Sequence, residues 1–390
     1  MEVWLDMTGE NIKKITLLNI HWGFSIGGVG KYVATIDNVG DYAPIKSESL
    51  CILCEDWHCD KQTLSQLRAQ EVVIKSRFDI SWLWRVAAEI DRIKPDVIMT
   101  HGFNGHFVSI LTGLLCSHKP VKICSYHGLY HAPTKARTLI QPALNLITEY
   151  YIRSVAQSAV SVAHYSKDYL LERRVSKNKV TVVHNGIDFI DEPPAGTRES
   201  LRAEWGVVED EVLLGIASRI DPVKGLDYLV DAVIELLKDG VNLKLVVIGT
   251  GTLEEELKAK AISSGCGDSI IFTGFRNDIA NCLAAFDLFM LPSLAEYHSI
   301  ALLEAMRAKK AIIATDVGGN TESVRHEQEA LIVRPANTVD LVSAIRQLVA
   351  NPQQAEQLAA AARARFEQEF STEKMVKSTA QWMMQSLGGS

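Results

Sequence analysis

Residues 288–306 read LFMLPSLAEYHSIALLEAM, and this stretch decides the class of fold. Four apolar residues predict a buried strand, a Pro-Ser pair predicts a turn, and apolar residues at helical spacing predict a helix that begins near Ser299. Glu296 would lie in the turn, and Glu304 about a turn and a half into the helix. Carboxylates accept hydrogen bonds from vicinal hydroxyls, and a helix N-terminus offers free N–H groups to phosphate. An exposed pair of glutamates is the alternative interpretation.

Short apolar runs alternate with longer amphipathic segments along the whole chain, which predicts parallel strands joined by crossover helices. The alternation pauses at residues 191–197, a linker candidate in which two acidic residues, two prolines and a glycine cluster. We therefore expect two α/β domains, at residues 13–190 and 197–370. A break near Phe370 would let a final helix, residues 371–390, leave the second domain. The expected strands are residues 15–20, 47–54, 72–74, 96–100, 121–126, 159–163 and 180–184, then 212–217, 243–248, 270–273, 288–291, 311–314 and 330–333. A long helix is expected at residues 134–156, with a bend at Pro142.

The composition is that of a globular protein in a reducing compartment. The chain has 390 residues, of which 47% are hydrophobic and 22% are charged. Its seven cysteines have no regular disulfide spacing. No apolar run has the length of a membrane span, and the acidic, polar N-terminus is unlike a signal peptide, so we expect a cytoplasmic protein.

Charge is divided unevenly along the chain, whose formal net charge is −7. Residues 1–190 carry 21 basic and 18 acidic side chains, whereas residues 191–390 carry 19 basic and 29 acidic ones. Residues 117–179 alone hold 10 basic and 3 acidic groups, interleaved with apolar ones. This segment is either a core-packing helix with solvated ends or a surface that meets an anionic membrane. In the second case the protein would bind at the inner face of the cytoplasmic membrane. Nucleic acid is not expected as a partner, because the chain is acidic and lacks a binding motif.

A glycine-rich loop, IGGVGK at residues 26–31, follows the first expected strand. Glycines between a strand and a helix let the backbone approach an anion at the helix N-terminus. The P-loop pattern fails because Ser25 and Tyr32 stand where it needs Gly and Ser or Thr, and the dinucleotide pattern fails because Val33 stands where it needs a small residue. A tight turn and a phosphate contact both stay open.

A second polar loop, SRIDPVKG at residues 218–225, follows the first strand of the second half. Ligands of open α/β sheets bind outside the carboxyl ends of the strands. Arg219 and Lys224 can converge there on one diphosphate, the arginine through its planar fork and the lysine as a point charge. Two solvated surface cations are the alternative.

Together these loops resemble the family-four retaining glycosyltransferases, which have the GT-B fold and use nucleotide sugars. The resemblance covers nearly the whole chain. It rests on Gly27-Gly28, residues 184–188 (HNGID), Ser218-Arg219 with Lys224-Gly225, Thr273-Gly274, residues 287–293, Glu296 with Glu304, and residues 315–319 (TDVGG) with Glu322. It implies two Rossmann-like domains facing a central cleft, an N-terminal one for the acceptor and a C-terminal one for the donor, with the C-terminal helix crossing back to the N-terminal domain.

The resemblance also implies a role for each candidate residue. Arg219 and Lys224 would bind the donor diphosphate and stabilise the leaving group. Glu296 would hold hydroxyls of the transferred sugar, and Glu304 the ribose hydroxyls. His127, at the end of an expected strand, matches a family histidine beside the donor sugar. The implied catalytic residues are Arg219, Lys224, Glu296 and His127, and the implied donor-binding residues are Gly27, Gly28, Gly274, Phe275, Arg276, Tyr297, His298, Ser299, Ile300 and Glu304.

One position departs from the family pattern. The family usually places a glycine and an aromatic residue after the first glutamate, where this chain has Tyr297 and His298. The bulkier Tyr297 must be accommodated, which leaves the identity of the donor sugar open. His298 is either a polar contact to the donor or a partly buried residue at the helix start.

The expected reaction needs no metal and no other cofactor. No two aspartates are separated by one residue, so the Asp-x-Asp metal motif of the other major glycosyltransferase fold is missing. Two cations and a helix N-terminus can neutralise the diphosphate instead. The resemblance implies retaining, front-face transfer of a hexosyl group from a UDP- or GDP-sugar to a glycan or lipid-linked acceptor, in bacterial-type surface polysaccharide or glycoconjugate assembly. The transition state would resemble an oxocarbenium ion.

Two other functions stay open: a nucleotide-sugar epimerase of GT-B-like fold, and a non-enzymatic two-domain protein that closes over a ligand. A zinc site at Cys51, Cys54, His58 and Cys59 is not expected, because the first two fall in a strand pattern and no second ligand pair has finger-like spacing.

Overall fold

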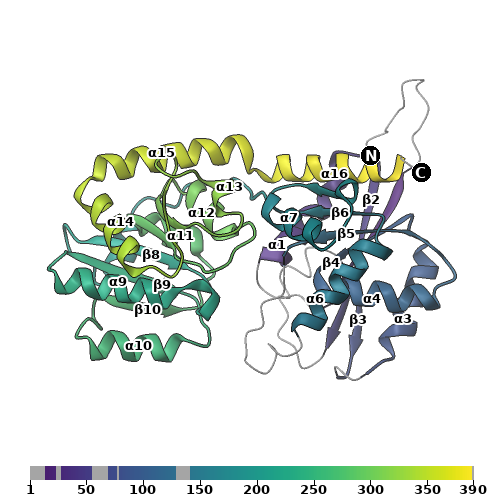
Figure 1. Ribbon diagram of the computed structural model, residues 1–390, viewed down its shortest axis with the longest axis horizontal. Coiled ribbons are helices and arrows are strands. Elements are labelled where there is room, and N and C mark those ends of the chain that lie inside the picture. Colours follow the sequence, from purple (N-terminus) through teal and green to yellow (C-terminus); the bar gives the residue numbers. More distant parts are fainter. Residues whose placement is uncertain (1–13, 23–27, 55–68, 77–78, 129–140, 389–390) are drawn as a thin grey trace. The chain divides into compact units, whose positions relative to one another are not determined.

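The chain forms two compact units, each built on one parallel sheet (Figure 1). Unit 1 comprises residues 1–185 and 372–390, and unit 2 comprises residues 186–371. The linker candidate at residues 191–197 therefore lies inside unit 2, a few residues beyond the division. The computed structural model describes residues 14–22, 28–54, 69–76, 79–128 and 141–388.

Unit 1 holds a sheet with the strand order β3-β2-β1-β4-β5-β6-β7, in which all neighbouring strands are parallel. The order reverses between β1 and β4, and α/β sheets bind ligands outside the carboxyl ends of the strands at such a reversal. The strands are β1 (Ile15–Trp22), β2 (Ile45–Cys54), β3 (Gln70–Ile74), β4 (Val97–His101), β5 (Val121–Tyr126), β6 (Ser158–Ser161) and β7 (Val180–Val182). The helices are α1 (Gly28–Ile36), the 3-10 helix η1 (Asp37–Asp41), α3 (Trp82–Ile93), α4 (Gly102–Leu115), α6 (Gln141–Tyr150), the π-helical turn η2 (Tyr151–Val155), α7 (His164–Glu172), the 3-10 helix η3 (Lys177–Lys179) and α16 (Thr372–Gly388).

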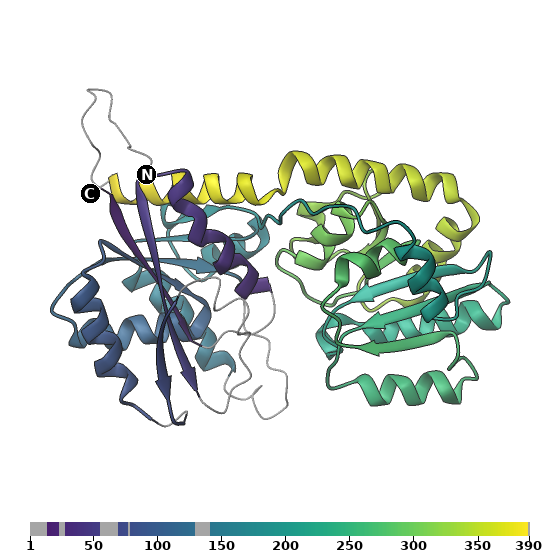
Figure 2. The ribbon, with the colours of Figure 1, turned by 180° about the vertical axis from the view of Figure 1, so that it is seen from behind.

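Helices cover both faces of this sheet, as a parallel sheet requires. On one face, Leu17 and Met99 pack with Val33 of α1 and Met375 of α16. The opposite face packs against α3 and α4. The last helix, α16, lies beside α1 on unit 1 (Figure 2). The predicted break near Phe370 is confirmed, because the preceding helix ends one residue before it and α16 begins two residues after it.

The long helix predicted at residues 134–156 is confirmed over its described part. Its described part begins with α6 and ends in the π-helical turn η2, and residues 134–140 lie outside the described residues. The bend predicted at Pro142 stays a prediction, because the residues before α6 lie outside the described residues.

Unit 2 holds a parallel sheet with the order β10-β9-β8-β11-β12-β13, which reverses between β8 and β11. The strands are β8 (Val212–Ala217), β9 (Leu243–Ile248), β10 (Ile270–Gly274), β11 (Leu288–Leu291), β12 (Ala311–Thr315) and β13 (Leu331–Val333). The helices are α8 (Thr197–Glu204), the 3-10 helix η4 (Pro222–Lys224), α9 (Leu226–Lys238), α10 (Glu254–Ser263), α11 (Ile279–Ala285), α12 (Ile300–Arg307), α13 (Asn320–Ser323), α14 (Thr338–Ala350) and α15 (Pro352–Glu369). None of the helices in the described part of the chain is long and apolar enough to cross a membrane.

Candidate functional site

The carboxyl edge of the unit 2 sheet brings together two loops that are far apart in the sequence. One follows β8 and carries Lys224, and the other follows β11 and carries Glu296. Because β8 and β11 are neighbours, the loops leave the sheet side by side. Lys224 Nζ donates to Glu296 Oε1 at 2.6 Å, and Ser293 Oγ donates to the same oxygen at 2.8 Å. The predicted strand–turn–helix thus holds a carboxylate and a lysine in one ion pair.

The backbone fastens the same two loops. The Leu294 N–H donates to the Val223 carbonyl at 2.8 Å. Gly225 has a φ of 64°, and a Cβ at this position would lie 2.1 Å from the carbonyl oxygen of Pro292. Both the backbone conformation and the space therefore demand glycine. The position of Lys224 is fixed by this close approach.

Arg219 is anchored within its own loop. Its Nη1 donates to Asp221 Oδ2 at 2.5 Å, and the other oxygen of the buried Asp221 carboxylate accepts long hydrogen bonds of 3.4 Å from the backbone N–H and the hydroxyl of Thr252. The arginine side chain is 59% exposed. One edge of the guanidinium is thus held while the rest faces solvent at the carboxyl edge of the sheet.

Helix α12 begins at this edge. Ser299 caps it, because its Oγ accepts from the Leu302 N–H at 3.4 Å. The first N–H groups of a helix have no intrahelical acceptor and attract an anion. Glu304, in the second turn, is half-buried. The candidate donor-binding residues of this segment thus lie in the loop after Glu296 and in the first two turns of α12; they are Tyr297, His298, Ser299, Ile300 and Glu304.

His298 points into unit 2. It is buried, with Nε2 at 3.3 Å from Ser323 Oγ and its ring centroid 5.4 Å from that of Phe370. Of the two interpretations of His298 from the sequence, this position agrees with the second, a residue that is buried at the helix start. Tyr297, just before it, is half-buried.

A third polar loop follows β10, which ends at Gly274 with a φ of 73°. Arg276 donates through Nε and Nη2 to both oxygens of Asp278, at 2.8 and 2.7 Å, and through Nη1 to Glu204 at 2.7 Å. The hydrogen bonds from Arg276 hold the pKa of Asp278 below its usual range. The ring of Phe275 is 60% exposed and lines a pocket of about 480 Å³. The loop therefore offers an aromatic face, while its guanidinium is already paired.

The carboxyl edge of the unit 1 sheet is lined by imidazoles from neighbouring strands. His21, His101 and His127 lie at the ends of β1, β4 and β5, with ring centroids 5.0 Å apart for the first pair and 6.0 Å for the second. The Tyr32 ring stands edge-on to His127 at 4.6 Å. Burial lowers the pKa of His21 to about 3 and that of His127 to about 4, so these rings are neutral at physiological pH. Gly28 begins α1 at this edge, and Gly27 lies outside the described residues.

Two family models match this chain. Residues 70–189 match Glycosyltransferase Family 4, and residues 197–365 match Glycosyl transferases group 1. The chain belongs to the family-four glycosyltransferases.

The relatives of this glycosyltransferase act on several kinds of molecule. An uncharacterized glycosyltransferase of Methanocaldococcus jannaschii is 26% identical over 66% of this chain and 69% of its own length. The 2-deoxystreptamine glucosyltransferase of Streptomyces kanamyceticus is 23% identical over 70% of this chain and 74% of its own. The UDP-Gal:alpha-D-GlcNAc-diphosphoundecaprenol alpha-1,3-galactosyltransferase of Escherichia coli is 25% identical over 63% of this chain and 64% of its own. The chain spans between 43% and 74% of the length of such relatives.

Solved structures confirm the GT-B fold. The Anabaena protein HepE in complex with UDP-glucose superposes with a TM-score of 0.82 at 18% identity, over 95% of this chain and 100% of that chain. A sucrose-phosphate synthase from Thermosynechococcus elongatus superposes with a TM-score of 0.80 at 19% identity, over 97% and 100%. At these identities the likeness shows the fold alone.

Several polar residues of the candidate site cannot be found from a motif. Asp221 and Ser293 stand beside residues that the motifs name, but only the fold shows that they anchor Arg219 and Glu296. In unit 1, no motif names His21 or His101. Their signal in the sequence is a histidine near the carboxyl end of a mostly apolar strand.

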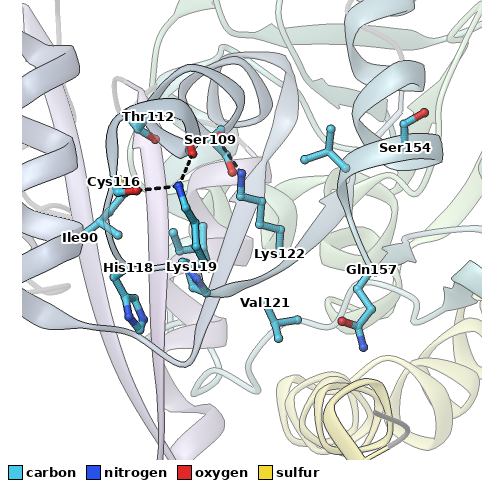
Figure 3. Close-up of a pocket in the computed structure, with 14 residues that line it drawn as sticks. Ile90, Ser109, Thr112, Cys116, His118, Lys119, Val121, Lys122, Ser154 and Gln157 are labelled. Carbon is cyan, nitrogen blue, oxygen red and sulfur yellow. Dashed lines mark hydrogen bonds between the residues drawn. The ribbon is translucent and has the colours of Figure 1, made fainter.

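Two lysines of the basic segment bind carbonyl groups of a helix C-terminus. A pocket of about 460 Å³ at the amino end of β5 is lined by Lys119 and Lys122 (Figure 3). Lys119 Nζ donates to the carbonyls of Gly113 and Cys116, and Lys122 Nζ donates to that of Ser109. These carbonyls belong to the last turns and the C-terminal cap of α4, where cations are favourable. The two lysines therefore have a structural role at the edge opposite the histidines.

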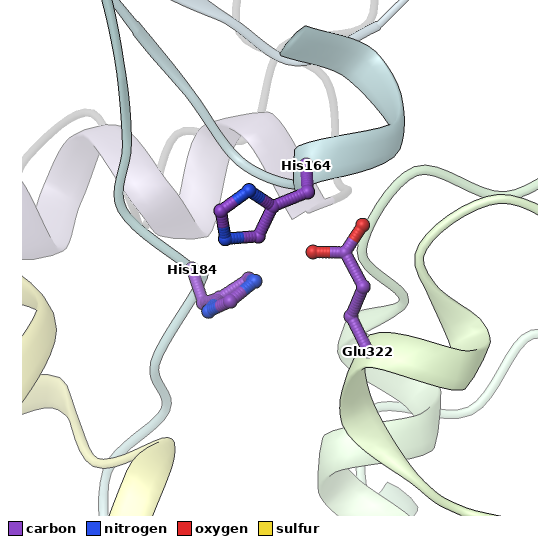
Figure 4. A group of neighbouring side chains, drawn as sticks. All are labelled: His164, His184 and Glu322. Carbon is purple, nitrogen blue, oxygen red and sulfur yellow. The ribbon is translucent and has the colours of Figure 1, made fainter. Parts of the chain in front are cut away.

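Two more histidines of unit 1 lie side by side. His164 begins α7 and His184 follows β7, and their rings meet edge-on at 5.8 Å (Figure 4). Glu322, also drawn there, belongs to α13 of unit 2.

Cys51 and Cys54 are both buried in β2, but they belong to the apolar clusters on opposite faces of the sheet, so they cannot share one metal ion. His58 and Cys59 lie outside the described residues.

Proposed function

We propose that this glycosyltransferase moves a hexosyl group from a nucleoside-diphosphate sugar to a glycan or lipid-linked acceptor, with retention of the anomeric configuration and without a metal ion. The observation that carries the proposal is the interlocked pair of loops after β8 and β11, in which Lys224 and Glu296 form an ion pair at the switch point of the sheet. Ligands of α/β sheets bind at that point, and a lysine and an arginine match a diphosphate there.

The donor would bind to unit 2. Lys224 gives one hydrogen bond to Glu296 and has two further N–H groups for phosphate oxygens. Arg219 presents the open part of its fork, and the N-terminus of α12 adds partial positive charge. Glu304 would accept the ribose hydroxyls, and the exposed ring of Phe275 would stack on the nucleobase. Solved structures of the same fold hold UDP or UDP-glucose, which supports a uridine nucleotide in the donor. A GDP-sugar is the other donor to be tested.

The chemistry follows from where charge develops. The bond between the anomeric carbon and the diphosphate oxygen breaks through an oxocarbenium-like transition state, and the leaving diphosphate gains negative charge. Lys224, Arg219 and the α12 N-terminus stabilise that charge, which is the task that a metal ion performs in other enzymes. The acceptor oxygen attacks from the same face, and its proton passes to the departing diphosphate. His127 would hold a hydroxyl of the transferred sugar.

The acceptor is proposed to be a glycan or glycolipid of a bacterial-type surface polysaccharide or glycoconjugate. The relatives named for a diphosphoundecaprenol substrate and for lipopolysaccharide core support this class. Contact with an anionic membrane through residues 117–179 would rest on cations at the surface, among them Arg153, Arg174 and Lys177, because Lys119 and Lys122 cap α4. Salt-dependent sedimentation with vesicles of phosphatidylglycerol and phosphatidylcholine tests the membrane contact.

One assay tests the proposed function. The protein is incubated with UDP- and GDP-hexoses, with and without a lipid-diphosphate sugar, and release of nucleoside diphosphate is measured. Release that requires the acceptor supports transfer. A changed sugar without release indicates an epimerase, and binding without either change indicates a ligand-binding protein; both outcomes contradict the proposal.

A further inference from the structure

One face of the unit 1 sheet changes from apolar to polar along its strands. Side chains alternate between the two faces of a strand, so Leu17, Asn19 and His21 of β1 share the face that packs under α1. Leu17 belongs to the apolar cluster of this face, and so does Met99 of the neighbouring strand β4. Beyond them, the last inward positions hold Asn19, His21 and His101, all buried. A polar end to a buried face is costly for folding, which indicates a function.

Four of the residues on this face form a hydrogen-bonded chain. His101 Nε2 lies 3.3 Å from Asn19 Oδ1, and Asn19 Nδ2 donates to Ser47 Oγ at 2.9 Å. The Ser47 hydroxyl donates to Asp37 Oδ1, in η1, at 2.6 Å. The chain of hydrogen bonds therefore runs from Asp37 in η1 to the imidazole of His101 at the carboxyl edge of the sheet.

The direction of this chain is set at its acidic end. An ionised carboxylate only accepts hydrogen bonds, so the Ser47 proton must point to Asp37. The Ser47 oxygen then accepts from the Asn19 amide, whose own oxygen must face His101. Because that oxygen can only accept, His101 carries its proton on Nε2. Burial keeps the imidazole neutral, by holding its pKa well below the ordinary value, so Nδ1 is a bare acceptor.

His101 also stacks on two other imidazole rings. Its ring stacks on His21 at 5.0 Å and on His127 at 6.0 Å, with interplanar angles of 25° and 27°. Over the residues that the structure describes, His101 Nδ1 and His127 Nε2 are buried and have no hydrogen-bond partner. Two unsatisfied imidazole nitrogens at one edge are suited to bind hydroxyl groups that enter with a ligand.

We propose that Asp37, Ser47 and Asn19 are positioning residues that hold His101 as its Nε2–H tautomer, and that His101 in turn holds His127 in the orientation that receives a hydroxyl of an uncharged sugar. The inference rests on the proposed function, because that function brings the sugar to this edge. The site is therefore suited to a neutral hexose, since a carboxylate would meet the lone pair of His101 Nδ1 there.

Ser47→Ala is the test, with Ser49→Ala as the matched control. Ser49 is two residues along on the same strand and face, is buried, and has no partner among the described residues. Long-range ¹H–¹⁵N spectra of the free protein report the tautomer of His101. We expect the Nε2–H form in the wild type and in Ser49→Ala, a mixture of tautomers in Ser47→Ala, and recovery of the single form in Ser47→Thr.

The kinetic measurement separates a positioning role from a structural one. In Ser47→Ala we expect kcat to fall about threefold to tenfold, with KM for the donor changed less than about twofold, and recovery in Ser47→Thr. An unchanged tautomer in Ser47→Ala, or an equal loss in Ser49→Ala, would overturn the inference. Absence of nucleoside-diphosphate release in the wild type would instead refute the proposed function. The tautomer is measured without turnover and would still decide whether the chain of hydrogen bonds sets it.

Discussion

Lys224→Met should destabilise unit 2 and weaken nucleotide binding, through two separable effects. The substitution leaves the Glu296 carboxylate with Ser293 as its side-chain donor among the described residues, and the side chains of the ion pair are only 18% and 11% exposed. Removing one partner of a buried pair costs about 3–5 kcal/mol. Because the pair is not fully buried and Ser293 still donates, we expect a loss of about 2–3 kcal/mol. The Tm should then fall by roughly 4–12 °C.

A second substitution separates stability from binding. Glu296→Gln in the Lys224→Met background removes the unpaired charge and keeps an acceptor for Ser293. Most of the lost stability should return, since replacing both members of a buried pair by neutral groups is often tolerated. Nucleotide affinity should stay low, because a charge-assisted hydrogen bond to phosphate is worth about 1.5–3 kcal/mol, or roughly 10- to 150-fold in Kd.

Thermal unfolding followed by circular dichroism, with and without UDP and GDP, measures stability, and calorimetric titration measures affinity. Lys258→Met is the matched control, because Lys258 pairs with Glu254 and Glu255 on the exposed side of α10. It should change stability by less than about 1 kcal/mol and leave binding unchanged. Wild-type affinity in Lys224→Met would refute the reasoning. So would a double variant that regains affinity together with stability, because the pair would then act through structure alone.

Three further predictions follow from the geometry. Gly225→Ala should lower Tm and nucleotide binding more than Gly240→Ala, because both positions have positive φ but only the first would place a Cβ 2.1 Å from the Pro292 oxygen; thermal unfolding of both variants checks this. Burial lowers the pKa of His106 to about 3, so between pH 6.5 and pH 3 only the unfolded chain takes up a proton on this ring. This group should therefore lower the free energy of unfolding by about 1.4 kcal/mol per pH unit on acidification, and His106→Leu should remove that contribution. Urea unfolding at several pH values measures the slope. Phe275→Ala should weaken nucleotide binding by about 0.5–1.5 kcal/mol without changing Tm, since the ring is 60% exposed; equal UDP affinity in both proteins would contradict it.

The fold of unit 2 could be predicted from the sequence in detail. Its six predicted strands differ from those in the structure by at most one residue at either end, because each is a short apolar run bounded by turn residues. The helix at residues 300–307 begins where the Ser299 cap predicts. In unit 1 the described part of the helix predicted at residues 134–156 is helical, but amphipathic periodicity does not show that its last turn, Tyr151–Val155, is π-helical.

The site was predicted in part, for a physical reason. Residues near each other in the sequence, such as Glu296 and Ser299, could be placed on one turn by spacing alone. The Lys224–Glu296 pair depends on β8 and β11 being neighbours, which is a property of strand order and not of local pattern. The link from Asp37 to His101 joins four elements, η1, β2, β1 and β4, so no motif could contain it.

The two edges divide the chemistry that a sugar nucleotide requires. A diphosphate gains charge as it leaves, and the cations Arg219 and Lys224 lie at the edge of unit 2. The hydroxyls of a sugar are uncharged, and the unit 1 edge holds imidazoles whose pKa values are lowered by burial, to about 3 for His21 and about 4 for His127. In the proposed reaction, protonation of these rings would add positive charge beside an oxocarbenium-like sugar and oppose its formation. The proposal therefore requires neutral histidines on one unit and anchored cations on the other, and each requirement can be tested in its own unit.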